Sequence, residues 1–67
     1  MFVKARFEYM DDDGIEKGCD TASFNDEGEF FAYMEKEYPN AERVPEGENW
    51  YWDENEMCSI IYYLYED

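Results

Sequence analysis

Histidine is absent from this 67-residue chain, and bases are scarce: 5 Lys and Arg stand against 19 Asp and Glu, for a net charge of −14. The scarcity of bases excludes a protein that binds nucleic acid directly, because Lys and Arg are the residues that neutralise phosphates. A transmembrane protein is also excluded, since no uncharged run approaches the roughly 18–20 residues that a span requires. The N-terminus has no apolar stretch of signal-peptide length, so we expect a cytoplasmic protein.

Cysteine is too sparse to define a metal site. Cys19 and Cys58 lie 39 positions apart, with no CxxC pair and no His to complete a zinc site. We expect two reduced and mostly buried thiols, with a single disulfide as the alternative. No His is present to activate a serine or cysteine nucleophile, and 19 acids produce carboxylate pairs by chance. We therefore predict no catalytic residues, no metal ligands and no cofactor, and we do not expect an enzyme.

One acidic run has a superficial likeness to a calcium-binding loop. In Asp11-Asp12-Asp13-Gly14 the glycine is the fourth residue, whereas an EF-hand loop has acidic or amide ligands at positions 1, 3 and 5 and glycine at position 6. The run is typical of a hairpin turn instead, and any divalent-ion binding by the acidic surface would be unspecific.

Aromatic residues, by contrast, are abundant: 14 of the 67 residues are Phe, Tyr or Trp, and 45% of the chain is hydrophobic. Acidic disordered chains are poor in aromatics, so this composition indicates a folded domain. A chain of this length buries only about 60% of its unfolded surface, and large rings fill such a small core efficiently. We predict one α+β domain over residues 1–67.

Alternation of apolar and polar residues predicts an N-terminal antiparallel hairpin. Residues 2–10 and 15–21 are the two strands, and residues 11–14 are the turn. The apolar side of the first strand consists of Val3, Ala5, Phe7 and Tyr9, opposite Lys4, Arg6 and Glu8.

Two registers are open for this hairpin. A three-residue loop with Gly14 in the left-handed conformation pairs Phe7 with Cys19 and sets Arg6 opposite Asp20, which would neutralise it. A two-residue loop would instead pair Phe7 with Asp20. We favour the first register because it keeps Asp20 off the apolar side.

A helix follows the hairpin, with Asn25 as its N-cap and Tyr38-Pro39 as its end. The residues at helical spacing that we expect to face the core are Phe30, Phe31, Met34 and Tyr38. Asp26, Glu29 and Glu37 lie on the other side of the helix, where no base is placed to pair with them locally.

The last third of the chain is ambiguous. Residues 40–49 are turn-rich with a short strand at residues 42–44, residues 49–52 look like a strand, and residues 53–56 look like a turn. Residues 57–65 are rich in strand-forming residues, yet the spacing of Asp53 and Glu56 is that of a helix capping box. We favour a strand, which gives the order ββαβ(β), and keep a C-terminal helix as the alternative.

The acidic charge is unevenly placed along the chain. After Arg6 there are 19 acids and 3 bases, and from Val44 to the end there are seven acids and no base. A charge of about −2 to −8 is enough for a small soluble domain, and Trp and Tyr, which anchor protein interfaces, are interleaved with these acids. The residues that we expect to bind a partner are Asp26, Glu29, Glu37, Glu46, Glu48, Trp50, Trp52, Asp53, Glu54 and Glu56.

The charge density invites a comparison with DNA. Duplex DNA carries one charge per about 1.7 Å, so this net charge matches roughly 24 Å of duplex, close to the size of a domain with a radius of gyration near 11 Å. In charge, size and aromatic content the chain resembles the class of small phage-encoded DNA mimics. That class includes restriction inhibitors, uracil-DNA glycosylase inhibitors, some anti-CRISPR proteins and antagonists of nucleoid proteins. The resemblance covers the whole chain but rests on no motif, so no residue role is carried over.

The leading hypothesis is therefore a non-enzymatic inhibitor that blocks the DNA- or RNA-binding groove of a basic host protein. If the chain is phage-encoded, it would act in the host cytoplasm. The alternative is an acidic interaction module that binds a partner protein through an exposed aromatic patch or a sheet edge. Neither hypothesis involves direct contact with nucleic acid or with a membrane, and the surplus of aromatic residues leaves a homodimer open.

Overall fold

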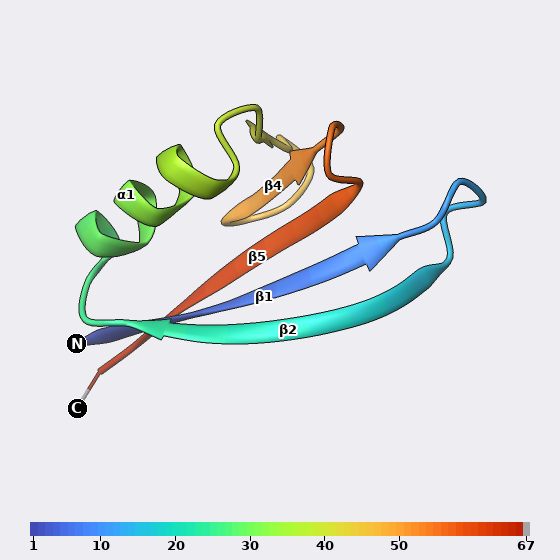
Figure 1. Cartoon of the computed structure of the whole chain (residues 1–67). Coiled ribbons are helices and arrows are strands. Elements are labelled where there is room, and N and C mark those ends of the chain that lie inside the picture. Colours follow the sequence, from blue (N-terminus) through green and yellow to red (C-terminus); the bar gives the residue numbers. More distant parts are fainter. Residues whose placement is uncertain (67) are drawn as a thin grey trace.

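A five-stranded antiparallel sheet carries a single helix on one of its faces in the computed structural model, which describes residues 1–66 (Figure 1). In chain order the elements are β1 (Phe2–Met10), β2 (Glu16–Phe24), α1 (Glu27–Glu37), β3 (Glu42–Arg43), β4 (Trp50–Asp53) and β5 (Cys58–Tyr65). The strands lie in the order β2-β1-β5-β4-β3, so that β5 is central. The predicted α+β class is confirmed.

The predicted order ββαβ(β) was incomplete, because the chain continues after the helix with three strands, the first only two residues long. Residues 58–65 form β5, so the alternative of a C-terminal helix was wrong. In the turn before β5 the Asp53 carboxylate accepts a hydrogen bond from the Glu56 backbone N–H at 3.0 Å, and the chain then reverses. The spacing of Asp53 and Glu56 therefore does produce a side-chain to backbone hydrogen bond, but this bond closes a turn and does not begin a helix.

The N-terminal hairpin combines features of both predicted registers. Gly14 has a φ of +78°, and the backbone N–H of Asp11 donates to the carbonyl of Ile15, as the three-residue loop requires. The register then shifts by one residue between Tyr9 and Met10, leaving Lys17 in a bulge. Beyond the bulge Phe7 lies opposite Asp20, so the favoured register was wrong for most of the hairpin.

That shift also changes the surroundings of Arg6. Thr21, rather than Asp20, lies opposite it, and the guanidinium is instead 3.5 Å from the Glu8 carboxylate and 3.6 Å from that of Glu16. The predicted pairing of Arg6 with Asp20 was wrong for the same one-residue reason.

Helix α1 begins one residue later than predicted. Asp26, not Asn25, is the N-cap, and its side chain accepts from the Glu29 backbone N–H at 2.8 Å. The Glu29 carboxylate returns the contact to Asn25, at 3.3 Å from its backbone nitrogen and 3.2 Å from its side-chain nitrogen. Tyr38 ends the helix as predicted.

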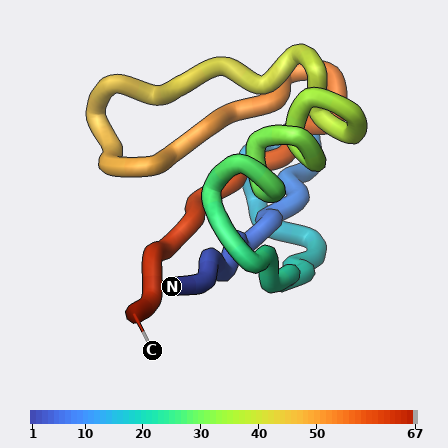
Figure 2. The backbone as a smooth tube through the Cα atoms, turned by 90° about the vertical axis from the view of Figure 1, so that its left-hand side faces the viewer, coloured from blue at the N-terminus to red at the C-terminus, as the bar shows by residue number. Residues whose placement is uncertain are grey.

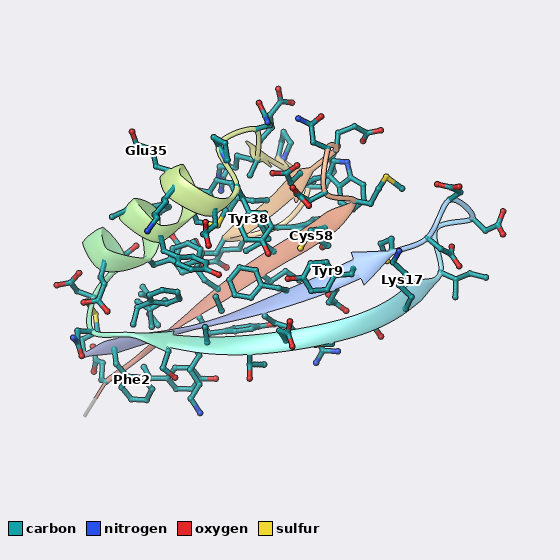
Figure 3. The ribbon with its side chains drawn as sticks, viewed as in Figure 1. Phe2, Tyr9, Lys17, Glu35, Tyr38 and Cys58 are labelled. Atoms are coloured by element: carbon teal, nitrogen blue, oxygen red, sulfur yellow. The ribbon has the colours of Figure 1, made fainter. Side chains whose placement is uncertain are left out.

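The core lies between α1 and one face of the sheet. Aromatic rings fill it, with Phe30 4.7 Å from Tyr62 and Phe7 stacked on Tyr38 at 5.5 Å between ring centroids. The Tyr38 and Tyr9 hydroxyls form a 2.8 Å hydrogen bond beside Cys58 (Figure 3). Of the predicted helix stripe, Phe30, Met34 and Tyr38 are buried, but Phe31 is exposed at the edge.

The opposite face of the sheet has no helix over it. Figure 3 places Glu35 on the helix side and Phe2 on the far side of the sheet. Figure 2 shows that the segment from the end of α1 to β4 loops away to one side of the helix, so it leaves this face uncovered as well. Within residues 1–66, the 11-residue α1 falls short of what a membrane crossing needs, and no other helix qualifies.

Core packing makes a prediction at Ile60, which is fully buried in the central strand. Ile60→Val should lower the free energy of unfolding by about 0.5–1.5 kcal/mol, because a methylene group leaves a packed core. The same change at Ile15, which is 62% exposed beside the hairpin turn, should alter it by less than about 0.5 kcal/mol. Urea denaturation of both variants measures this, and equal effects would contradict the assignment of the core.

Candidate partner-binding surfaces

The carboxylates predicted on the helix are all exposed, but they differ in their local contacts. Asp26 and Glu29 are exposed and belong to the N-terminal capping contacts described above. Glu37 is exposed in the last turn, at the other end of α1. Glu35, which was not predicted, adds a further exposed carboxylate between them. The exposed acids of the helix do not form one line, because at 3.6 residues per turn Glu35 lies about 120° around the axis from Glu29 and about 160° from Glu37.

A second group of predicted acids flanks β4. Glu46 and Glu48 are exposed in the loop before this strand, and Glu54 and Glu56 are exposed in the turn after it. The two pairs are separated by the length of a four-residue strand, on the order of 13 Å. The structure therefore brings these four residues to two ends of β4 rather than into one cluster.

Asp53 does not belong to the exposed acidic surface. Its side chain is only 1% exposed, and it accepts the hydrogen bond from the Glu56 backbone that closes the turn before β5. The prediction that Asp53 contacts a partner is not supported by this position, because the carboxylate faces the interior. The sequence pattern could not separate this aspartate from its exposed neighbours.

Both tryptophans project from β4 onto the sheet face that the helix leaves open. The Trp50 indole N–H donates to the Ser59 hydroxyl at 2.7 Å, and the Trp52 indole N–H donates to the Glu54 carboxylate at 2.6 Å. Each ring is half-buried. Trp52 also lines a hollow of about 550 Å³, and Glu42 and Glu54 are among the other residues that line it.

We call the uncovered side of the sheet the open face; its residues follow from the strand register. Residues that lie opposite each other on paired strands point to the same face of the sheet. The outward residues of β1 therefore identify the outward residues of β5, β4 and β2. The large side chains that share this face are Phe2, Trp50, Trp52, Ile61, Tyr63 and Tyr65. Tyr63 and Tyr65 were not among the predicted partner-binding residues, although the alternation of side chains along β5 places both on this face.

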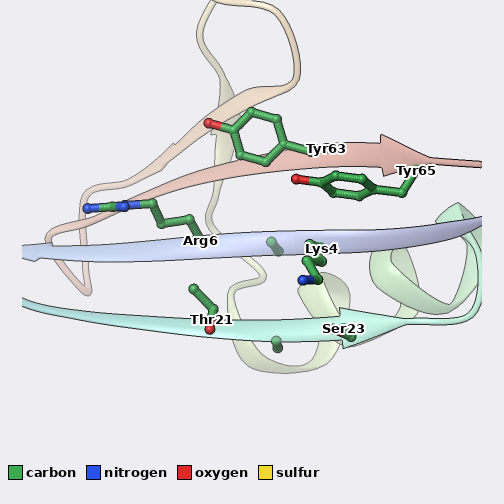
Figure 4. Close-up of a pocket in the computed structure, with 8 residues that line it drawn as sticks. Lys4, Arg6, Thr21, Ser23, Tyr63 and Tyr65 are labelled. Carbon is green, nitrogen blue, oxygen red and sulfur yellow. The ribbon is translucent and has the colours of Figure 1, made fainter.

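Bases gather on the same open face. Lys4, Arg6, Thr21, Ser23, Tyr63 and Tyr65 surround a shallow hollow of about 380 Å³, and Figure 4 shows their side chains on the side of the sheet that faces away from the helix. The Lys4 ammonium lies 5.7 Å from the centre of the Tyr65 ring, within cation–π range. Two of the five bases of the chain are therefore placed on the open face.

Charge is consequently sorted between the two sides of the molecule. The charged residues that the register places on the open face are Lys4, Arg6, Glu8, Glu16 and Glu42, with a net charge of −1. The other charged residues within 1–66 are fifteen acids and three bases, a net charge of −12. The helix side, the loops and the turns hold nearly all the excess.

The shape lowers the charge density below the expected value. The radius of gyration, 11.8 Å, is close to expectation, but the Cα trace extends 39 Å along its longest axis. A charge of −14 over that length is one charge per about 2.8 Å, or about 60% of the density of duplex DNA. The long β1–β2 hairpin is responsible, because it reaches well beyond the helix (Figure 1).

The acidic turn at Asp11 is a hairpin turn, as predicted. The Asp11 carboxylate accepts from the backbone N–H groups of Asp13 and Ile15, each at 3.0 Å. Across residues 1–66, no three His, Cys, Asp or Glu side chains are arranged so that they could hold a metal ion.

The cysteines are free and differ in their surroundings. Cys58 is buried, whereas Cys19 is exposed on the open face, contrary to the prediction that both are mostly buried. Burial raises the pKa of the Cys58 thiol to about 11, with nearby Asp53 and Glu56 adding to the effect. Burial also raises the pKa of Tyr62, whose hydroxyl donates to the Glu27 carboxylate at 3.2 Å.

No protein-family model, curated protein or solved structure matches this chain.

The raised pKa of Cys58 predicts a loss of stability at alkaline pH. Below the ordinary thiol pKa of 9.0 both states hold the proton, and between that value and about 11 the unfolded state releases it first. The free energy of unfolding should therefore fall as the pH rises through this window, and Cys58→Ala should reduce the slope. Cys19→Ala is the matched control, and urea denaturation from about pH 8 to about pH 10.5 is the measurement. An unchanged slope in Cys58→Ala would refute the assignment.

Proposed function

We propose that this protein is a non-enzymatic inhibitor that imitates the charge of nucleic acid and blocks the DNA- or RNA-binding groove of a basic host protein. Such a partner would be a restriction, CRISPR, repair or nucleoid protein. The observation that supports the proposal is the sorting of charge, which leaves a net charge of −12 on the helix side, the loops and the turns taken together, within residues 1–66.

The exposed acids of α1 and of the two segments that flank β4 are available to a partner. Between side chains of residues 2–66, the ion pairs are those of Arg6 with Glu8 and with Glu16, both on the open face. The carboxylates of α1 and of the β4 flanks are thus not neutralised by bases of the chain itself. A basic groove would supply the missing cations, and long-range attraction would speed the encounter.

Trp52 provides a candidate anchor at the rim of this acidic surface. Its indole lies between Glu54, to which it is hydrogen-bonded, and the hollow shared with Glu42. A half-buried indole bordered by carboxylates combines apolar contact with charge, which is the composition that slows dissociation of protein complexes. The charge would then govern association, and the ring would govern residence time.

The proposal is tested by capture from a host lysate that has been treated with nuclease. Immobilised protein should retain a basic protein that duplex DNA elutes, and the complex should weaken at least about tenfold between about 0.05 and 0.5 M salt. If the captured protein resists both DNA and salt, charge mimicry is refuted. An unrelated polyanion such as polyglutamate, added at equal charge, controls for unspecific ion exchange.

Substitutions of acids at two different places distinguish binding through a directed acidic surface from binding through net charge alone. Replacing Glu46, Glu48, Glu54 and Glu56 by Gln should weaken binding at least about tenfold, because several charge contacts are lost together. Replacing Asp12 and Asp13 by Asn, at the far hairpin tip, changes the net charge at a site away from β4 and should have much less effect. Titration calorimetry with the captured protein compares the variants; equal losses per charge removed would argue against a directed surface.

The second candidate function is an interaction module that binds a partner through an aromatic patch or a sheet edge. The nearly neutral, aromatic open face favours it, as does β2, whose nine residues form an outer edge of the sheet. In that case Trp52→Ala should abolish capture while the four Glu→Gln changes hardly matter. The two candidates therefore predict opposite rankings of the same two variants.

A further inference from the structure

The open face is unusual for the outer side of an antiparallel sheet. Such a face is normally polar, and β1 and β2 follow that rule with Lys4, Arg6, Thr21 and Ser23. The central strand β5 breaks it. Tyr63 is 48% exposed and Tyr65 is 42% exposed, and Ile61 lies beside Trp50 of β4. A contiguous aromatic strip on a water-facing sheet indicates a surface that is covered in use.

We propose that a second copy of this chain covers the open face, so that two sheets stack face to face as a homodimer. Stacked sheets lie about 10 Å apart and interdigitate the side chains of their inner faces. The strip on β5 and β4 would then form the centre of the interface, with the polar residues of β1 and β2 at its rim. The proposal does not depend on the proposed function, because its centre on β5 lacks the acids that the proposed function uses; the two surfaces share Trp52, at the edge of the strip.

Charge favours a second copy in this orientation above any other. Two chains of −14 repel each other, and the repulsion is smallest when the faces that meet are nearly neutral. The open face has a net charge of −1 and carries both signs, so Lys4 of one copy can approach acids such as Glu8 or Glu42 of the other. Both helix layers would point outward, on opposite sides of the dimer.

The same charges disfavour a nucleic acid on this face. Aromatic rings with neighbouring bases can bind single strands, but they do so within a positively charged groove. Here Arg6 already contacts Glu8 and Glu16, and the chain as a whole repels phosphates. Lys4 is then the one base of the face without a carboxylate partner among residues 2–66.

The area of the open face suits a dimer of modest affinity. Five strands about 4.8 Å apart and up to nine residues long, at about 3.3 Å per residue, give roughly 500–650 Å² per copy once the short strands are allowed for. Stable interfaces bury about 1,200–2,000 Å² in total, so two such faces reach the lower end of that range. We therefore expect a dissociation constant on the order of micromolar.

Adjacent residues of β5 offer a matched pair of variants. Tyr63 and Leu64 are 48% and 46% exposed, and they project to opposite faces of the same strand. Tyr63→Lys should raise the dimer dissociation constant at least about tenfold, because a charge enters the centre of the interface. Leu64→Lys makes the same addition of charge on the helix side and should leave it unchanged. Circular dichroism melting confirms that both variants are folded.

The oligomeric state is measured by sedimentation velocity of the purified chain without any partner. The concentration runs from about 1 to about 200 µM, a range that starts near the expected dissociation constant. Wild type and Leu64→Lys should dimerise from low micromolar concentrations, whereas Tyr63→Lys should need concentrations at least about tenfold higher. Tryptophan emission gives a second readout, since Trp50 and Trp52 are the tryptophans of the chain and both lie on this face. Their emission should shift to shorter wavelength as the dimer forms.

Salt separates this dimer from the partner complex. Added salt screens the repulsion between two acidic chains, so the homodimer should tighten about tenfold between about 0.02 and 0.5 M NaCl. A complex held by charge attraction changes in the opposite direction. Failure of dimerisation would therefore leave the proposed function standing, and failure of DNA-competed capture would leave the dimer standing.

Three outcomes would overturn the proposal. A monomer at 200 µM in 0.5 M NaCl would show that no second copy covers the face. A dimer that survives Tyr63→Lys but is lost in Thr21→Pro would place the contact at the β2 edge instead. A monomer whose tryptophan emission shifts on addition of oligothymidylate would assign the face to a single-stranded nucleic acid.

Discussion

The pairing of β5 between β1 and β4 is the constraint on which the rest of the structure depends. Because side chains alternate along paired strands, this one register decides which residues reach the core and which reach the open face. Ile60 and Tyr62 meet the helix, while Ile61 and Tyr63 face away from it. A slip of β5 by one residue would exchange the two sets, so that Ile61 and Tyr63 would enter the core and Ile60 and Tyr62 would reach the open face.

The separation of charged and aromatic residues accommodates two properties that a small domain has difficulty combining, a high net charge and a surplus of aromatic rings. A charge of −14 opposes folding by self-repulsion, and fourteen aromatic residues exceed what a 67-residue core can hold. The structure places most of the acids on the helix side, the loops and the turns, and the surplus rings on the open face. The two proposals therefore use different properties of the same molecule, one its charge and the other its apolar contact, and they share Trp52.

Much of the fold could be predicted from local pattern. The alternation in residues 2–10, the turn with Gly14 and the end of α1 at Tyr38 are fixed by interactions within a few residues. The hairpin register could not be predicted, because the bulge at Lys17 is set by the pairing with β1 and has no sequence signature. The burial of Asp53 could not be predicted for a related reason, because burial is decided by distant strands.

The central claim is that the excess negative charge lies off the open face, on the helix side, the loops and the turns. Paramagnetic relaxation enhancement of the backbone amides, measured by NMR with a cationic and with a neutral nitroxide probe, tests it directly. The ratio of the two enhancements reports local potential independently of accessibility. The account predicts a high ratio around Glu35 and in the flanks of β4, and a ratio near one around Ile61 and Tyr63. Equal ratios on the two sides would contradict it.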